Sequence, residues 1–222
     1  MKFALLKDNS REFITILNYC ILTKSDYKIF KSHEVPDKDY IPYGTVEWTD
    51  KILKANYDVK VTPDYYPNYL SEFLHRKVWK TDDFPINKRV FIKPADSYKR
   101  FTGFVTDGTY KGKKRGPYYC SEIVKFQNEF RYYISHKEIL ASGWYDGEDE
   151  NVPAPDISEH IDKLPNDLVC ALDLGTLENN EVALIEQQHP YACGWYGEPS
   201  QGKHFVRWVI DGWEYLKSKK GE

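Results

Sequence analysis

Two acidic side chains interrupt a pair of strongly apolar segments in the last quarter of the sequence. Asp173 lies inside the first segment and Glu186 ends the second. The Asn179-Asn180 pair between them suits the two central positions of a type I′ turn, because Asn adopts a positive φ more readily than most other residues. A hairpin closed by this turn would place Asp173 opposite Glu186, with their Cβ atoms about 4.5–5.5 Å apart.

Two carboxylates that face each other in apolar strands require a positive charge nearby. Like charges in this position repel, and burying either one without a partner is unfavourable. Gln188 lies two residues after Glu186 and therefore shares its face, which adds an amide oxygen. Oxygen ligands with an incomplete shell suit Mg²⁺, which takes its other ligands from water and phosphate. The alternative is that one carboxylate ends its strand in solvent or pairs with a lysine.

Basic side chains on other segments have types and positions that suit anion binding. Lys93 ends an apolar strand at Pro94, which cannot continue a strand ladder; it can contact phosphate there or extend its stem to solvent. Alternation within 129–134 puts Arg131 on the polar face, where a guanidinium can hold a phosphate or carboxylate through two hydrogen bonds. The basic loop 108–116 is expected to be a solvated hairpin tip, with phosphate or nucleic-acid contact as the alternative.

The first third of the chain has the pattern of a small α/β unit. A strand at 3–6 is followed by a helix through 13–20, for which Asp8 or Ser10 is the candidate N-cap, and by a strand at 27–30. Between 37 and 67, periodicity is poor and predicts only one helix, through 46–53.

Beyond about residue 82 the sequence changes to short apolar runs separated by turn residues. These runs predict a mainly antiparallel sheet structure. A C-terminal helix with Phe205, Trp208 and Trp213 in its apolar stripe is expected to dock on that sheet. The predicted strands before the hairpin are 90–93, 103–105, 119–124, 130–135 and 139–145.

The composition excludes several classes of protein. With 31 basic and 34 acidic residues the net charge is −3, so no global field attracts the chain to nucleic acid or to an anionic membrane. No stretch approaches the roughly 18 apolar residues of a membrane span, so a cytoplasmic location is expected. The four cysteines include no C-x-x-C pair and are expected to be buried free thiols rather than zinc ligands.

The order of the motifs resembles the ATP-grasp superfamily. More narrowly, it is similar to a clade of small bacterial and phage ATP-grasp proteins marked by one arginine and two lysines. The resemblance covers about 82–217. In chain order, the motifs that carry it are Lys93-Pro94, Lys99 before Phe101-Thr102-Gly103, Ser121-Glu122-Ile123-Val124, Glu129-Phe130-Arg131, Ala171-Leu172-Asp173-Leu174-Gly175 and Leu184-Ile185-Glu186.

The resemblance implies an α+β ATP-grasp fold, in which two β-rich lobes clasp ATP after a small α/β domain. The expected N-terminal domain is 1–81 and the expected ATP-grasp domain is 82–222. Within the latter, the small lobe would cover about 82–124 and the large lobe about 125–222.

The resemblance also implies a role for each matching residue. Two departures from the superfamily pattern stand beside these roles: the glycine-rich phosphate loop is replaced by 95–100, and Gln188 stands where a metal-binding Asn is usual. The implied assignments are Lys93 and Lys99 on the phosphates, the backbone of Glu122, Ile123 and Val124 on adenine as the hinge, Arg131 on the γ-phosphate or the phosphorylated intermediate, and Asp173, Glu186 and Gln188 on Mg²⁺.

The implied activity is that of an ADP-forming ligase that depends on ATP and Mg²⁺. Such an enzyme activates a carboxylate as an acyl phosphate for attack by an amine or other nucleophile. Two alternatives stay open: ATP-dependent modification or joining of RNA ends, and nucleotide binding without turnover. The acceptor, whether small molecule, peptide or RNA, and the oligomeric state are not defined by the sequence.

Overall fold

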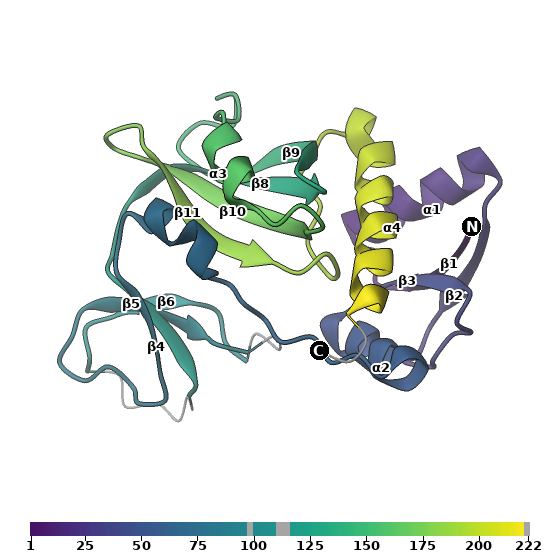
Figure 1. Ribbon diagram of the computed structural model, residues 1–222, viewed down its shortest axis with the longest axis horizontal. Helices are drawn as coiled ribbons and strands as arrows, with labels where there is room; N and C mark the ends of the chain where they lie inside the picture. The colour runs from purple at the N-terminus through teal and green to yellow at the C-terminus, as the bar shows by residue number, and fades with distance from the viewer. Residues whose placement is uncertain (97–99, 110–115, 220–222) are drawn as a thin grey trace.

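The computed structural model describes residues 1–96, 100–109 and 116–219. Within them, the strands form one three-stranded sheet and two four-stranded sheets. Figure 1 shows the N-terminal sheet at one end, the larger C-terminal sheet in the middle and the smaller sheet at the other end. This mixed α and β architecture is the predicted α+β class.

The N-terminal unit is a parallel sheet with helices. β1 (Lys2–Leu6) lies between β2 (Asp26–Phe30) and β3 (Tyr40–Tyr43), and both pairings are parallel. The helices are α1 (Arg11–Thr23) and α2 (Val46–Tyr57). Ser10 caps α1, since its hydroxyl accepts a hydrogen bond from the Phe13 amide at 3.1 Å. The predicted unit is therefore present, together with β3, which sequence periodicity did not predict.

Helix α4 (Gly202–Ser218) joins the N-terminal unit to the large sheet (Figure 1). Its apolar stripe includes Phe205 and Trp208, both fully buried. The same hydrophobic core contains Phe3 from β1 and Tyr133 from the large sheet. The helix was expected to dock on the sheet; it also packs on the N-terminal unit, so the two parts share one core.

The large sheet is antiparallel, in the order β11-β10-β8-β9. One face packs on the shared core, and the other is covered by α3 (Ser158–Lys163) and the 3₁₀ helix η1 (Asn68–Leu74). A second 3₁₀ helix, η2 (Pro199–Gln201), precedes α4. The strands are β8 (Phe126–Ser135), β9 (Glu138–Gly147), β10 (Val169–Leu177) and β11 (Val182–Gln188).

The small sheet has the order β4-β7-β5-β6 and a core of its own. Its strands are β4 (Val78–Thr81), β5 (Val90–Pro94), β6 (Phe104–Thr106) and β7 (Tyr118–Ser121).

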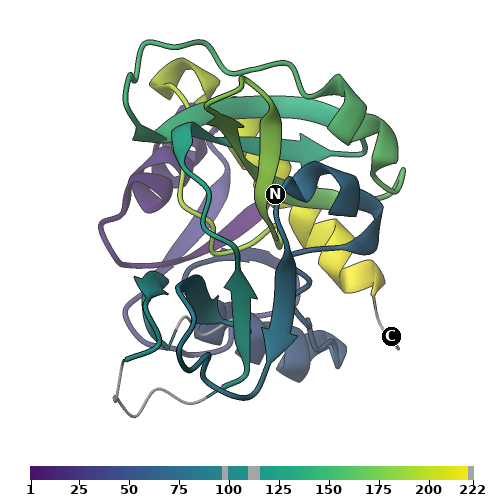
Figure 2. The same cartoon turned by 90° about the vertical axis from the view of Figure 1, so that its left-hand side faces the viewer.

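Two predicted boundaries differ from these elements. A boundary after Thr81 would separate β4 from the sheet in which it pairs with β7. The strand expected over 119–124 ends at Ser121, because the chain leaves the small sheet there and enters the large sheet at Phe126. Figure 2 shows this connection rising in teal from the small sheet to the large one.

The hairpin of β10 and β11 pairs Asp173 with Glu186, as predicted. The predicted type I′ turn is wrong, however, because of the two asparagines only Asn180 has a positive φ, at 67°. The Leu177 amide donates to the Glu181 carbonyl at 2.9 Å, so three residues form the loop instead of two.

A β-bulge compensates for this difference in loop length. Leu174 pairs with Leu184, but the next residue, Asp173, pairs with Glu186, so Ile185 is the extra residue. Without the bulge, the three-residue loop would have placed Asp173 opposite Ile185. The pairing of the two carboxylates therefore depends on an irregularity that the turn residues do not encode.

The cysteines fit their predicted state, since all four are buried and free. Among the described residues, no helix is long and apolar enough to cross a membrane.

Candidate functional site

A cleft of about 670 Å³ lies between the small sheet and the large sheet. Side chains of both sheets and of the chain that connects them line it. Its lining is Tyr65, Tyr66, Arg76, Phe91, Lys93, Pro94, Asp96, Phe101, Thr102, Gly103, Val105, Ser121, Glu122, Ile123, Val124, Phe126, Glu129, Tyr145, Ile185 and Glu186.

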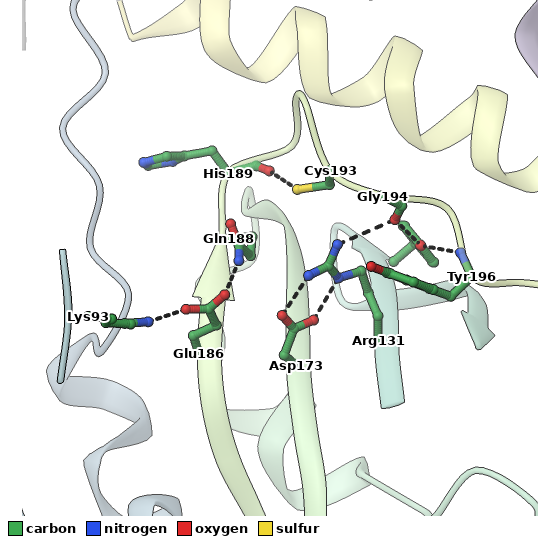
Figure 3. Close-up of polar contacts among 10 residues, drawn as sticks. Lys93, Arg131, Asp173, Glu186, Gln188, His189, Cys193, Gly194 and Tyr196 are labelled. Atoms are coloured by element: carbon green, nitrogen blue, oxygen red, sulfur yellow. Dashed lines mark hydrogen bonds and ion pairs between the residues drawn. The ribbon is translucent and has the colours of Figure 1, made fainter. Parts of the chain in front are cut away.

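Lys93 and Glu186 meet across this cleft (Figure 3). The lysine comes from the end of β5 and donates from Nζ to Oε2 of Glu186 on β11, while Nε2 of Gln188 donates to Oε1. The two charged side chains are only 13% and 17% exposed. Lys93 therefore joins the small lobe to the large lobe at Glu186 and Gln188, the two residues of β11 that were predicted to bind the metal.

The local environment keeps Lys93 charged. Burial alone would lower the pKa of Lys93, but the nearby Glu186 carboxylate and Tyr66 outweigh it, so the pKa lies above its ordinary value. An ammonium held this way is the form that attracts an anionic ligand.

Arg131 and Asp173 form a second ion pair beside the first (Figure 3). They lie directly opposite each other on β8 and β10, and two parallel hydrogen bonds of 2.7 Å join Nε to Oδ1 and Nη2 to Oδ2. Their side chains are 8% and 3% exposed. Burial raises the pKa of Asp173 and Arg131 opposes that shift; two charge-assisted bonds of this geometry favour the ionised pair.

The remaining face of Arg131 packs against a loop before α4. Nη1 donates to the Gly194 carbonyl at 3.4 Å, and the guanidinium lies 5.2 Å from the ring centre of Tyr196. The Tyr133 hydroxyl fixes the same loop, since it donates to the Gly194 carbonyl at 2.6 Å and accepts from the Tyr196 amide at 3.0 Å. Arg131 is thus held on three sides, and its contact with a γ-phosphate stays a prediction.

These pairs supply the positive charge that the two facing carboxylates were predicted to require, and Glu186 makes the lysine pair that was the alternative to a metal site. Asp173 has Arg131 and Glu186 has Lys93, so each acid has its own cationic side chain. Within the described residues, no group of three or more His, Cys, Asp and Glu could hold a metal ion. The predicted Mg²⁺ ligands are two carboxylates and the Gln188 amide, an oxygen set of the kind that Mg²⁺ completes with water and phosphate.

The predicted hinge lies where the chain passes between the lobes. Glu122, Ile123 and Val124 follow β7 directly and all three line the cleft. The Glu122 amide donates to the Lys77 carbonyl at 3.0 Å, and the Lys77 amide donates to the Glu122 carboxylate at 2.9 Å. The contact of this segment with adenine stays a prediction. Lys99 and most of the basic loop, 110–115, lie outside the described residues.

Glu129 and Tyr145 are cleft residues that the sequence analysis did not assign. Burial raises the pKa of Glu129, while a hydrogen bond with Tyr145 opposes the shift. Glu129 lies two residues before Arg131 in the same strand, so strand alternation would have placed it on the same face.

Tyr65, Tyr66 and Arg76 were also missed. Arg76 donates to two backbone carbonyls of β11, at 2.7 and 3.3 Å, and burial lowers its pKa. The tyrosines lie in a segment without periodicity, and nothing local in the sequence indicates that it passes the cleft.

Comparison with known protein families identifies the family of the chain that forms this cleft. The family described as ATP-grasp domain, R2K clade family 2, matches residues 73–202. The chain belongs to this ATP-grasp family. The match confirms the predicted superfamily, and its start at residue 73 takes in β4.

Solved ATP-grasp structures share the fold at low sequence identity. The RimK domain protein ATP-grasp from Sphaerobacter thermophilus has a TM-score of 0.54 and 10% identity over 99% of both chains. The carboxyaminoimidazole ribonucleotide synthase from Aspergillus clavatus, complexed with ATP, has a TM-score of 0.54 and 12% identity over 95% of this chain and 76% of its own. The ATP-grasp ligase PsnB, complexed with a minimal precursor, has a TM-score of 0.51 and 7% identity over 95% and 99%. A comparison with curated proteins found no match.

Proposed function

We propose that this ATP-grasp chain is a ligase that depends on ATP and Mg²⁺ and activates a carboxylate for attack by an amine or other nucleophile. The observation that carries the proposal is the Lys93–Glu186 pair across the cleft. A phosphate-binding cation on one lobe and a metal-binding carboxylate on the other meet at the place where Mg²⁺·ATP would need both. Membership of the family supports the same assignment.

The cleft provides complementary environments for the parts of a nucleotide. Phe91, Val105 and Ile185 supply apolar surface for a base beside the hinge backbone. Lys93, and by prediction Lys99, supply positive charge for the phosphates, and Arg131 is proposed to face the phosphoryl group that is transferred.

The oxygen donors of β10 and β11 fit a magnesium ion. Asp173, Glu186 and Gln188 would hold it, and when bound it would neutralise charge on the phosphate oxygens. The charge balance of the site changes with it, since Glu186 now neutralises Lys93. A carboxylate shared with a divalent cation would leave Lys93 available to phosphate.

The proposed reaction has two group transfers. An oxygen of the substrate carboxylate attacks the γ-phosphorus, the bond to the β-phosphate oxygen breaks, and ADP leaves with an acyl phosphate formed. The nucleophile then attacks the acyl carbon, inorganic phosphate leaves, and the nucleophile gives up a proton. Catalysis in this scheme comes mainly from positioning and from neutralising phosphate charge.

The comparisons support an acceptor that is a peptide or a small molecule. PsnB was solved with a minimal precursor, and the macrocyclase MdnC from Microcystis aeruginosa, with a TM-score of 0.50, was solved with the precursor peptide MdnA. The synthase from Aspergillus clavatus is named for a small carboxylated product. These likenesses concern the fold, and the acceptor of this chain stays a proposal.

The proposal is tested by measuring nucleotide products. The protein is incubated with Mg²⁺ and ATP and with pools of amino acids, peptides or RNA ends, and ADP and AMP are separated by chromatography. ADP that depends on amino acids or peptides supports the ligase. Binding of Mg²⁺·ATP without any turnover would favour a nucleotide-binding protein, and no binding at all would refute the assignment.

A second candidate, modification or joining of RNA ends, is favoured by the charge of the small lobe. Between residues 76 and 124, twelve lysines and arginines accompany five aspartates and glutamates, although the whole chain has a net charge of −3. A groove of about 600 Å³ on this lobe is lined by Lys77, Lys88 and Arg89 together with Trp79, Val90 and Glu122. Basic groups beside an aromatic ring suit single-stranded nucleic acid. Release of AMP that depends on RNA ends would support this candidate.

A further inference from the structure

Three tyrosines surround the ammonium group of Lys93. Nζ lies 4.4 Å from the ring centre of Tyr65, 4.7 Å from that of Tyr66 and 5.9 Å from that of Tyr119. The rings also pack on one another edge to face, with Tyr66 and Tyr119 at 4.9 Å and Tyr65 and Tyr119 at 5.9 Å. We call these three residues the tyrosine cage. A cation within about 6 Å of an aromatic ring face is attracted by the ring quadrupole.

The cage is assembled from two distant parts of the chain. Tyr119 lies on β7 directly opposite Lys93 on β5. Tyr65 and Tyr66 come from the segment 58–67, which connects α2 to η1 and belongs to neither lobe's sheet. The cage therefore links the chain before the ATP-grasp strands to the lysine in the cleft.

Contacts that do not involve Lys93 hold this segment in place. The Gln187 amide on β11 donates to the Tyr65 carbonyl at 2.9 Å, and the Tyr65 hydroxyl donates to the Asp96 carbonyl at 3.2 Å, just beyond β5. Tyr65 is only 7% exposed. These bonds reach both lobes, so Tyr65 is held in place by contacts that do not involve Lys93.

The cage and Glu186 hold Lys93 in different ways. The Glu186 carboxylate can also coordinate an Mg²⁺ ion, whereas the aromatic rings do not ligate Mg²⁺. If Glu186 turned to a metal ion, Lys93 would lose its ion pair but would keep three ring faces within about 6 Å.

We propose that Tyr65, Tyr66 and Tyr119 are positioning residues that keep Lys93 directed into the cleft when Glu186 exchanges it for Mg²⁺. The inference rests on the proposed function, because the exchange requires Mg²⁺·ATP to bind. It adds a role for the segment before the ATP-grasp strands, which supplies two of the three rings. The tyrosines act through the lysine.

The test compares Tyr66→Leu, which removes the ring, with Tyr66→Phe, which keeps it. The dissociation constant for Mg²⁺ with a non-hydrolysable ATP analogue is measured by calorimetry. Tyr66→Phe removes the hydroxyl, which hydrogen-bonds Lys93, so the two variants are compared with each other. Tyr66→Leu should bind about tenfold more weakly than Tyr66→Phe, since only the leucine variant loses the cation–π contact. Tyr27→Leu, at a 42% exposed position on β2, controls for a non-specific loss of stability.

A double-variant cycle separates positioning from direct contact with the nucleotide. Tyr66→Leu is repeated in a Lys93→Gln background at higher analogue concentration. If Tyr66 acts through the lysine, the leucine variant should add less than about twofold to the loss already caused by Lys93→Gln. A further tenfold loss would mean that Tyr66 contacts the nucleotide itself, and the positioning role would be overturned.

Nuclear magnetic resonance supplies a measurement that does not depend on affinity. Ring currents should shift the ε-methylene signal of Lys93 away from those of the other lysines, with Lys93→Gln identifying the signal. The shift should persist when Mg²⁺ and the analogue are added, and in Tyr66→Phe, but should shrink in Tyr66→Leu. Its collapse on addition of the analogue would refute the cage role, whereas failure of the natural protein to bind the analogue would refute the proposed function and leave the shift in the free protein intact.

Discussion

Replacing Asp173 with asparagine should destabilise the protein in the absence of nucleotide. The carboxylate makes two 2.7 Å hydrogen bonds to Arg131, and the two side chains are 3% and 8% exposed. Asparagine has nearly the same shape but no charge, so it would leave the guanidinium buried without a counter-ion. Removing one partner of a buried pair costs about 3–5 kcal/mol.

The loss should fall at the lower end of that range, because the asparagine oxygen still accepts one hydrogen bond. A loss of about 3 kcal/mol in the free energy of unfolding corresponds to a drop of about 6–12 °C in melting temperature for a chain of this size. The assay is thermal and urea unfolding in EDTA, which keeps divalent metal from occupying the acids.

Glu186→Gln is the matched control. It is the same chemical change on the neighbouring strand, but Glu186 is 17% exposed and its partner Lys93 is 13% exposed. The loss there should be less than half of that for Asp173→Asn, since water screens the remaining charge better. Adding Arg131→Met to Asp173→Asn should recover part of the loss, because it removes the unpaired charge.

The sign of the effect decides between two accounts of the acids. If repulsion between Asp173 and Glu186 dominated, Asp173→Asn would raise the melting temperature. A variant as stable as the natural protein, or more stable, would refute the conclusion that Arg131 compensates Asp173.

The other predictions concern the nucleotide and pH. Lys93→Ala should weaken binding of Mg²⁺·ATP more than tenfold, measured by calorimetry, while the fold persists; unchanged affinity would make the residue structural. ATP should be preferred to GTP in the nucleotide-release assay, because the backbone of 122–124 is proposed to bind the adenine edge, and equal use would count against this hinge. Burial lowers the pKa of His160, which stacks on Phe73 at 3.9 Å. The folded protein therefore binds this proton less readily than the unfolded chain, so stability should fall as the pH drops below about 6.5, and His160→Phe should reduce that slope in urea titrations; an unchanged slope would exclude His160 as its source.

Local patterns predicted those parts of the site that depend on the face of a strand. Alternation placed Arg131 on the polar face of β8, and it lies there beside the loop around Gly194. The apolar runs located β10 and β11, because strands covered on both faces need such runs. The order of the motifs then indicated the ATP-grasp fold, which the family match confirms.

The pairing of Asp173 with Glu186 shows where local reasoning ended. The predicted two-residue turn and a three-residue loop differ by one position, and a one-residue slip changes which side chains face each other. The bulge at Ile185 removed the difference. The pairing was therefore predicted correctly from a wrong turn, since the bulge offsets the extra loop residue. The turn residues do not specify such a bulge, so the sequence could not have predicted it.

The sequence by itself determined the strands that carry Arg131, Asp173 and Glu186 and the face of each strand on which they lie, because residue type and alternation are local properties. Only the tertiary structure decided which basic side chain forms an ion pair with which carboxylate. Arg131 meets Asp173 through strand pairing, but Lys93 reaches Glu186 only because two separate sheets face each other. The tyrosine cage required still more, since it depends on the path of a segment without periodicity. Contacts between such distant segments are fixed by the packing of the whole chain, and no short pattern records them.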